Sequence, residues 1–457
     1  AHRMADEAER QAAGCKDEKR KKELLTIAEN CRVVPENPPQ TFWQALQLLW
    51  FAHVYFHIEV CTTACSFGRF DQYMWPYYKK DVIDEKNITK EEALELLECF
   101  YLKTCEVYEV RDKWYATSFA GYPMWEILKV GGQTKDGKDA TNELSYVCLE
   151  AANQLKTTQP VMAVRVWKET PQDLIDKGCM MIQDGQANPG FFNDDAAIKM
   201  VLGKGATMEE ARDWNIIGCI QPGPGGGTID GSPDAGYVNM GKMIEFVLHN
   251  GVDPETGKLM GLQTGDPREF KNIEAFKDAL KAQILHHYKL VAEGYKIMQS
   301  AHMTRYPVIF ASMVTKGCVE SGKSVQDGGA KYSTCGMYIT GAANLADSIA
   351  AVEKCVFEDK DVTMDELIKA LDTNFEGNER LRQLLLNKPE KFGNDCEHVD
   401  SIYKEMMHFI ADNVQQWPDA RGGSFSFNVH SQTVNVSHGM VCGATPDGRK
   451  AGEPLCD

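Results

Sequence analysis

The sequence predicts one large α/β unit, in which helices cover a largely parallel sheet that can close into a barrel. Apolar runs rich in Val, Ile and Phe alternate with helical patterns along most of the 457 residues. These runs are continuously apolar, as expected for strands that are buried on both faces. No internal repeat, low-complexity tract or evident linker divides the chain, so we expect a single unit over residues 1–457.

The N-terminal part is predicted to be helical. Residues 1–35 are charged and helix-prone, and Pro38 and Pro39 end that pattern. The following segment, 42–60, is apolar around most of its helical circumference, which predicts a deeply buried helix. Thr89, followed by acidic residues, predicts the start of a helix over 90–110. We expect these helices to pack against the sheet.

The remainder of the chain alternates between predicted strands and helices. The predicted strands are 159–167, 188–192, 213–221, 305–314 and 423–436. The predicted helices are 171–184, 194–203, 239–249, 275–299, 345–357, 363–373 and 400–415. In parallel α/β folds the functional residues lie on the loops that follow the strands.

Composition excludes several classes of function. The net charge is −17 and no basic stripe occurs, which argues against a nucleic-acid partner. No apolar run is long enough to predict a membrane span. Fifteen cysteines, scattered without a CxxC pair, predict reduced thiols in a cytoplasm. His53 and His57 lie one helical turn apart, but no convincing third ligand stands beside them in the sequence, so we predict no metal site.

Cys219 stands where an apolar run ends, within the segment WNIIGCIQPGPGGG (214–227). Three interpretations are open. The thiol can be a buried structural group. It can be a nucleophile, which requires a nearby base, although the next histidine downstream is His249. It can also lose a hydrogen atom in radical chemistry, which requires an enclosed, dry site instead of a base.

Seven stretches, in order and spread over the chain, resemble the glycyl radical enzymes, the pyruvate formate-lyase-like superfamily. The first surrounds Cys219 and continues as DGSPDAGYVNMGKMIEFVLHNG. The other six are AENCRVVPENPPQTFWQALQLLWF, SFGRFDQYMWPYYKKD, DATNELSYVCLEA, FFNDDAAIKM, GGAKYSTCG and GATPDGRKAGEPL. A single short motif of this kind would be weak evidence, whereas seven in the family's order are strong evidence.

This resemblance implies a ten-stranded α/β barrel made of two antiparallel half-barrels, with surrounding helices. It implies that Cys219 takes part in hydrogen-atom transfer with a small substrate, with no bound cofactor. The radical would reside on a glycine and be installed by an S-adenosylmethionine/iron–sulfur activating enzyme. A homodimer in the cytoplasm of an anaerobic bacterium is implied as well. The family's glycyl motif and its N-terminal part do not occur in the sequence. We therefore expect a barrel incomplete at both ends, the central portion of a longer enzyme, and no activity from this chain alone.

The residues around Cys219 bear on the type of reaction. Gly218 and Ile220 flank it, whereas pyruvate formate-lyase carries two adjacent cysteines, which argues against acyl transfer. The resemblance implies Cys-x-Glu in the diol dehydratases and in the choline and hydroxyproline lyases. This chain has Gln221 at the last position, and an amide cannot act as a general base. We therefore favour carbon–carbon lyase chemistry, such as arylacetate decarboxylation.

Two further positions leave alternatives open. Thr63 and Ala64 stand where the glycerol dehydratase-like members have His-Ser, which again departs from the dehydratases. Asp234 matches an acid that holds substrate hydroxyls in that subgroup, so a C–O or C–N eliminase stays open. A fumarate-adding synthase is a third possibility. A thiol hydrolase, with a histidine near Cys219, and a non-catalytic relative with no cavity are the alternatives from other classes.

The candidate site combines residues that the resemblance and the strand ends bring forward. Cys219 and Gln221 are the predicted catalytic residues. The predicted substrate-binding residues are Thr63, Ser66, Trp125, Phe192, Asn193, Ser232, Asp234, Tyr237 and Tyr338. For most of these, simple packing in the core is an equal alternative. Arg69 and Asp71 are predicted to form a structural pair. For His57 and His430, a buried structural histidine is favoured over binding of a substrate carboxylate.

Overall fold

The computed structural model describes residues 1–60, 64–107, 109–110, 112–118, 124–218, 220–228, 235–429 and 433–456. Nine strands are described, in three sheets. They are β1 (Gly68–Arg69), β2 (Ile127–Gly131), β3 (Val161–Val166), β4 (Gly190–Asn193), β5 (Asn215–Ile217), β6 (Gln221–Gly223), β7 (Gly236–Asn239), β8 (Thr334–Thr340) and β9 (Ser424–Asn428). Strands β1 to β4 pair in parallel, β5 and β6 form an antiparallel hairpin, and β7 to β9 pair in parallel.

Helices make up most of the remaining structure. The α-helices are α1 (His2–Gly14), α2 (Glu18–Val33), α3 (Phe42–Glu59), α4 (Phe70–Tyr73), α5 (Trp75–Tyr78), α6 (Lys90–Thr104), α7 (Lys113–Ser118), α8 (Glu143–Leu155), α9 (Gln172–Gln183), α10 (Asp194–Gly203), α11 (Met208–Arg212), α12 (Met240–Leu248), α13 (Ile273–Arg305), α14 (Ile309–Val314), α15 (Cys318–Ser321), α16 (Ala342–Val352), α17 (Met364–Asp372), α18 (Glu379–Asn387), α19 (Glu397–Val414) and α20 (Val434–Met440). Short π- or 3₁₀-helical segments cover Lys79–Asp84, Pro267–Glu269, Val325–Asp327 and Glu353–Glu358.

Each parallel sheet has its own hydrophobic core. Strands β2 and β3 pack with α3, α6 and α8 in a cluster that includes Leu128, Val164 and Leu97. Strands β7 to β9 pack with α12, α13, α16 and α19 in a larger cluster. Because helices cover these strands, their apolar residues are continuous along the chain instead of alternating.

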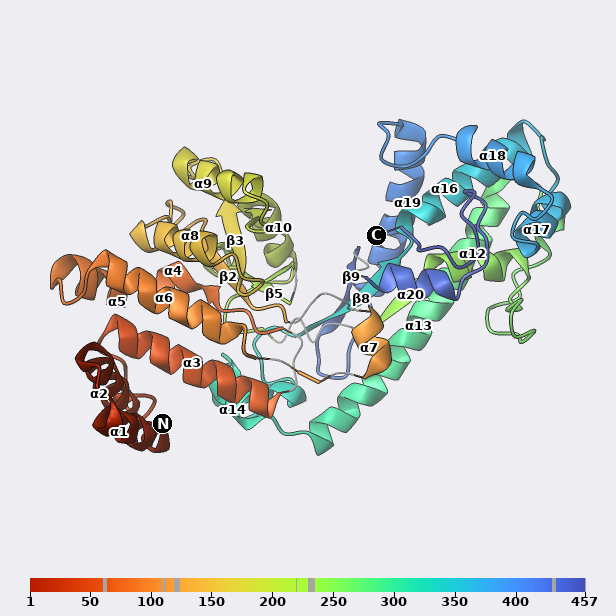
Figure 1. Cartoon of the computed structure of the whole chain (residues 1–457). Coiled ribbons are helices and arrows are strands. Elements are labelled where there is room, and N and C mark those ends of the chain that lie inside the picture. Colours follow the sequence, from red (N-terminus) through yellow and green to blue (C-terminus); the bar gives the residue numbers. More distant parts are fainter. Residues whose placement is uncertain are drawn as a thin grey trace.

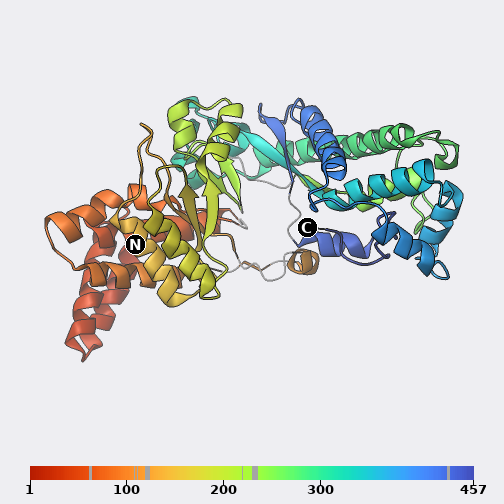
Figure 2. The same ribbon diagram turned by 90° about the horizontal axis from the view of Figure 1, so that it is seen from above.

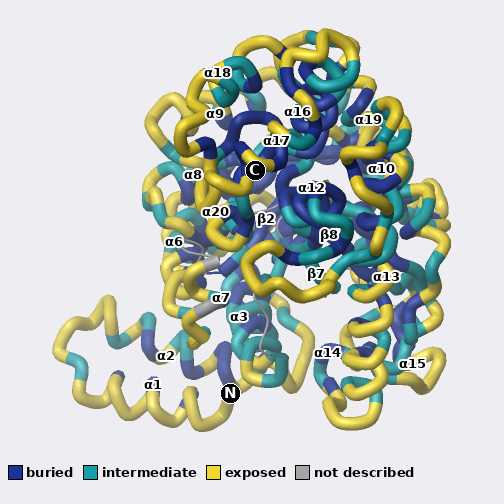
Figure 3. The backbone as a smooth tube through the Cα atoms, turned by 90° about the vertical axis from the view of Figure 1, so that its right-hand side faces the viewer, coloured by how far each residue is buried: buried dark blue, intermediate teal, exposed yellow. Residues whose placement is uncertain are grey.

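The two sheets stand side by side, and the β5–β6 hairpin lies where their strand ends approach each other (Figure 1). Figure 2 shows the same two halves from above. Figure 3 shows that burial concentrates along β2, β8 and α12, whereas α1 and α2 project outward with exposed faces. Helix α7 comes from the N-terminal half but lies against α20 of the C-terminal half. None of the helices in the described part combines the length and apolar character that a bilayer-spanning helix requires.

The predicted elements agree with the structure in most places. The parallel sheets covered by helices are present, and the predicted strands at 159–167 and 188–192 correspond to β3 and β4. The helices predicted at 42–60 and 90–110 correspond to α3 and α6, although α6 ends at Thr104, and all seven helices predicted after residue 170 occur. The predicted strand 213–221 is interrupted by a turn: it contains β5 and ends at Gln221, the first residue of β6. Strands β1, β2, β7 and β8 were not predicted. The closed ten-stranded barrel stays a prediction, because among the described residues strand pairing occurs only within the three sheets.

Two strand predictions were wrong. The run 423–436 is β9 only as far as Asn428, and α20 begins at Val434. The run 305–314 contains no strand, because its end forms helix α14. The cause is a contact distant in sequence. The carboxylate of Glu59, at the end of α3, accepts hydrogen bonds from the first three N–H groups of α14, Ile309 to Ala311, at 2.7–2.9 Å. This satisfies donors that otherwise oppose helix formation.

Replacing Glu59 should therefore destabilise the packing of α14 on α3. We expect Glu59→Ala to lower the free energy of unfolding by about 1–2 kcal/mol, because three helix N–H groups lose a charged acceptor. Urea denaturation followed by circular dichroism measures the change. Glu29→Ala, at an exposed position of α2, is the control and should have no effect. An equal loss in both variants would contradict the capping role.

Candidate active site

The hairpin of β5 and β6 carries the predicted catalytic residues. Ile217 pairs with Gln221, so the chain reverses direction between these two residues. Gly218 begins this turn with φ of +59°, a left-handed conformation that favours glycine. Cys219 itself lies outside the described residues. The same holds for four other positions singled out from the sequence: Thr63, Ser232, Asp234 and His430.

Gln221 lies against two tyrosines of the second sheet. Its side-chain amide donates a hydrogen bond to the hydroxyl of Tyr338, a buried residue of β8. Tyr237, on β7, stacks on Tyr338 with ring centroids 4.9 Å apart. The structure thus brings together three of the predicted site residues. We refer to these three residues, together with His438, whose ring lies edge-on to Tyr237, as the Gln221 cluster.

His438 is a member of this cluster that the sequence did not reveal. It belongs to α20, and its ring stands edge-on to Tyr237 with centroids 6.4 Å apart. Burial lowers the pKa of His438 to about 4, so the imidazole is neutral near pH 7. Its Nδ1 is buried and has no hydrogen-bond partner in the part of the chain that the structure describes. A lone histidine in an apolar segment gave no signal, because only folding brings it beside Tyr237.

The neutral state of His438 predicts a dependence of stability on pH. The unfolded histidine binds a proton below about pH 6.5, whereas the folded one does so only below about pH 4. Stability is therefore lost as the pH falls through this window, by about 3 kcal/mol in total. We expect urea denaturation curves of His438→Gln to lack this part of the decline. His408→Gln, at an exposed position of α19, should retain it, and equal curves for wild type and His438→Gln would contradict the assignment.

A buried charged network holds the strand that leads to Cys219. Asp194 accepts hydrogen bonds from Arg165 Nε at 2.6 Å and from the indole Nε1 of Trp214 at 2.9 Å. Lys129 donates to the backbone carbonyl of Trp214 at 2.8 Å and lies over its ring. Burial and the neighbouring arginines hold the pKa of Lys129 well below its usual range. The network connects β2, β3 and α10 to the residue before β5.

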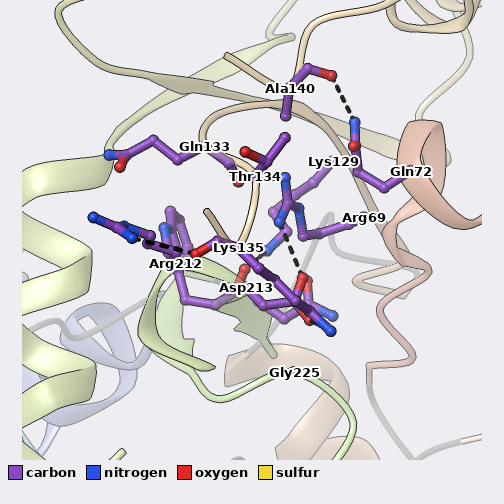
Figure 4. A network of polar contacts seen from close by, with 12 residues as sticks. Arg69, Gln72, Lys129, Gln133, Thr134, Lys135, Ala140, Arg212, Asp213 and Gly225 are labelled. Atoms are coloured by element: carbon purple, nitrogen blue, oxygen red, sulfur yellow. Dashed lines mark hydrogen bonds and ion pairs between the residues drawn. The ribbon is translucent and has the colours of Figure 1, made fainter. Parts of the chain in front are cut away.

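Arg69 belongs to the same region (Figure 4). Its guanidinium pairs with Asp213 at 3.0 Å and donates to the backbone carbonyl of Gln133 at 2.8 Å. The predicted pair of Arg69 with Asp71 was therefore wrong in its partner, although both side chains are structural. Asp71 instead accepts hydrogen bonds from Ser145 Oγ and from the backbone N–H of Gly131. Arg69 ends β1 whereas Asp71 belongs to α4, and the two side chains have different hydrogen-bond partners.

The other predicted site residues in the described part have contacts of their own. Phe192 packs near Trp214, with ring centroids 6.5 Å apart. Asn193 caps α10, with its side-chain oxygen accepting from the N–H groups of Asp195 and Ala196. Both observations favour structural roles. Ser66 and Trp125 lie on the segments that lead into β1 and β2, and the Ser66 hydroxyl is buried without a hydrogen-bond partner among the described residues.

Comparison with known proteins identifies the family. The pyruvate formate lyase-like family model matches residues 1–439. The chain belongs to this family of glycyl radical enzymes. It is 34% identical to trans-4-hydroxy-L-proline dehydratase of Clostridioides difficile and 34% identical to isethionate sulfite-lyase of Bilophila wadsworthia, over all of this chain in each case. It is 32% identical to indoleacetate decarboxylase of Tractidigestivibacter scatoligenes, again over the whole chain.

The structural comparison agrees. The glycerol-bound B12-independent glycerol dehydratase of Clostridium butyricum superposes on the whole chain with a TM-score of 0.95 at 38% identity. This likeness confirms the predicted pyruvate formate-lyase type of α/β fold. The chain spans 57% of that structure and 54–58% of these relatives. The family and these relatives support an enzyme of the glycyl radical lyase type.

Proposed function

We propose that this chain forms the substrate-binding part of a glycyl radical lyase that eliminates a leaving group from a small hydroxylated substrate. The observation that carries this proposal is the likeness to a hydroxyproline dehydratase, a glycerol dehydratase and an isethionate sulfite-lyase at 34–38% identity over the entire chain. It revises the preference for decarboxylation, which rested on Gln221 and now finds support in one relative at 32% identity.

The proposed reaction balances without an external oxidant. A glycyl radical, installed by a radical S-adenosylmethionine enzyme, supplies the initiating radical. The Cys219 thiyl takes a hydrogen atom from the carbon that bears the substrate hydroxyl. The leaving group departs from the neighbouring carbon with the bonding electron pair, and the hydroxyl loses its proton. The thiol then returns the hydrogen atom to the product radical, so the net change is loss of the leaving group with one proton.

The proton from the hydroxyl needs an acceptor, and Gln221 cannot be that acceptor because its amide has no basic site near neutral pH. We assign this role to His438. Its pKa of about 4 gives it the basicity of an ordinary glutamate, whose pKa is about 4.3. Its neutral Nδ1 is available among the described residues, and it stands beside the tyrosine stack that holds Gln221. Gln221 and Tyr338 would then position the substrate by hydrogen bonds.

Three further proposals concern the domain organisation, the cellular environment and the oligomeric state. The β5–β6 hairpin is tied to the first sheet through Trp214 and to the second through Gln221 and Tyr338, which supports a single unit over residues 1–457. A reducing environment, such as the cytoplasm of an anaerobic bacterium, is proposed from the scattered cysteines of the sequence and from the family. A homodimer is proposed from the family resemblance.

The test uses the complete polypeptide that carries this sequence, activated anaerobically by its partner enzyme. Glycerol, 1,2-propanediol and isethionate are offered beside indoleacetate and phenylacetate. We expect an elimination product from a hydroxylated substrate. His438→Gln should lower kcat by about 10²–10⁴-fold, the usual contribution of a general base. His408→Gln should leave kcat unchanged.

A double variant tests the role of the base, and the products distinguish elimination from decarboxylation. Gln221→Glu in the His438→Gln background introduces a carboxylate two residues after Cys219, and we expect it to recover part of the eliminase activity. Carbon dioxide from an arylacetate, with no product from the hydroxylated substrates, would overturn the eliminase proposal and favour the decarboxylase. Unchanged kcat in His438→Gln would remove His438 from the mechanism while leaving the reaction class intact.

A further inference from the structure

A second group of chemically active side chains lies at the end of helix α3, apart from the Gln221 cluster. His53 and His57 stand four residues apart on one face of this helix. Cys65 precedes β1, and Glu126 precedes β2. Because Ala64 pairs with Trp125 in a parallel bridge, Cys65 and Glu126 follow on adjacent segments. The end of α3, the segment just after it and the distant segment before β2 thus meet at one place, which we call the α3 histidine site.

The donor atoms of this site are close together. One ligand atom from each of His53, His57 and Cys65 lies within 4.8 Å of the other two. The two imidazole rings have centroids 4.5 Å apart. In a tetrahedral zinc site with Zn–N of about 2.0 Å and Zn–S of about 2.3 Å, the donors are about 3.5 Å apart. Side-chain adjustments of about an ångström would therefore close the present arrangement around an ion.

Glu126 has the position of a carboxylate that supports a histidine ligand. Its Oε1 lies 2.7 Å from Nε2 of His53 and 3.7 Å from Nε2 of His57. Metal-bound histidines commonly donate their second N–H to such a carboxylate, which fixes the tautomer and turns the other nitrogen toward the metal. With Nε2 of His53 engaged by Glu126, Nδ1 is the nitrogen left for an ion.

Burial makes this arrangement costly without a ligand. The side chains of His53 and Glu126 are 1% and 0% exposed, and that of His57 is 7% exposed. Nδ1 of His53 is buried and has no hydrogen-bond partner in the described ranges. A buried polar atom without a partner costs free energy that a core of apolar residues would avoid. A cation bound at this nitrogen would remove that cost.

We propose that His53, His57 and Cys65 bind one transition-metal ion of the zinc class, with Glu126 orienting His53. Two imidazoles and one thiolate are a borderline-soft donor set that suits Zn²⁺ and Co²⁺ and disfavours Mg²⁺ or Ca²⁺. Three protein ligands leave one position for water or a small ligand. This site stands on the contacts at α3 alone, so it does not depend on the proposed elimination reaction.

The test uses the complete polypeptide, freed of metal with a chelator under anaerobic conditions and titrated with Co²⁺. We expect one cobalt ion per chain, with thiolate-to-cobalt charge-transfer absorption and the visible bands of tetrahedral cobalt, and displacement by Zn²⁺. Cys65→Ser should abolish the charge-transfer band and weaken binding by roughly 100-fold or more. Glu126→Gln should keep the band and weaken binding by about 10–100-fold, as for other supporting residues.

Cys99→Ser is the matched control, because its thiol is exposed and distant in sequence from the site; it should leave the titration unchanged. Absence of Co²⁺ and Zn²⁺ binding by the wild type, or a charge-transfer band that persists in Cys65→Ser, would overturn the proposal. Since a variant at this buried place can fail to fold, X-ray absorption of the zinc-loaded wild type gives a second measurement. We expect one sulfur and two imidazole nitrogens around zinc, and a shell without sulfur would overturn the site.

Discussion

Cys219→Ser in the activated complete enzyme should abolish turnover and leave the glycyl radical in place. Under the proposed mechanism every turnover begins and ends with hydrogen-atom transfer at the Cys219 sulfur. A serine of similar size cannot replace it, because its O–H bond is too strong to exchange a hydrogen atom with carbon or with the glycyl radical. We expect a loss on the order of 10⁶-fold in kcat, the scale seen when a residue that makes and breaks bonds is removed.

Two measurements together make this result specific. Electron paramagnetic resonance of Cys219→Ser should show the same glycyl radical signal as the wild type, because the activating enzyme acts on the glycine and not on this cysteine. Product analysis should show no conversion of any substrate that the wild type converts. Cys179→Ser, at an exposed thiol of α9, should retain both the signal and the turnover. Turnover retained by Cys219→Ser would remove this cysteine from the chemistry.

Asp194→Asn should produce the largest loss of stability. Asp194 is fully buried and accepts hydrogen bonds from Arg165 Nε, from Trp214 Nε1 and from the backbone N–H of Gln133. Burial and the positive charge of Arg69 lower the pKa of Arg165 to about 10, so this guanidinium stays charged at neutral pH. An asparagine has nearly the same shape as Asp194, but it removes the negative charge that compensates Arg165. Its NH₂ group would also face N–H donors that now bind a carboxylate oxygen. Breaking a buried ion pair in this way costs about 3–5 kcal/mol.

Urea denaturation of the complete polypeptide, followed by circular dichroism, measures this loss. The matched control is Asp195→Asn, because Asp195 is the next residue of the same helix turn and its side chain is exposed. We expect the control to change stability by less than about 0.5 kcal/mol. Since the network holds Trp214 before β5, Asp194→Asn should lower activity as well. A loss no larger than that of the control would show that the network is not needed for folding.

The arrangement of elements could be predicted where local patterns decide it. Continuous apolar runs identified β3 and β4, and amphipathic periodicity identified α9, α10 and α17. The run at 309–314 shows where such patterns fail. Five apolar residues and one serine are compatible with a strand or with a buried helix, and the carboxylate of Glu59, about 250 residues away, decides for the helix.

The candidate site divides in the same way. Ordered motifs were sufficient to identify the family, and they contain Gln221 and Tyr237, both of which contact the third predicted residue, Tyr338. They did not identify His438, because its place beside Tyr237 arises only when α20 packs beside β7. They also set aside the pair His53 and His57 for want of a third ligand, which folding supplies from Cys65.

The sequence by itself determined the family, the α/β class and the presence of an amide at position 221, because these depend on residue identity and order along the chain. The tertiary structure decided which charges are paired, which histidine is neutral, and which thiol lies beside two imidazoles. Those properties depend on burial and on distances between segments far apart in the sequence. Local patterns carry little information about such distances, because a side chain's pKa and its partners are set by whatever packs around it.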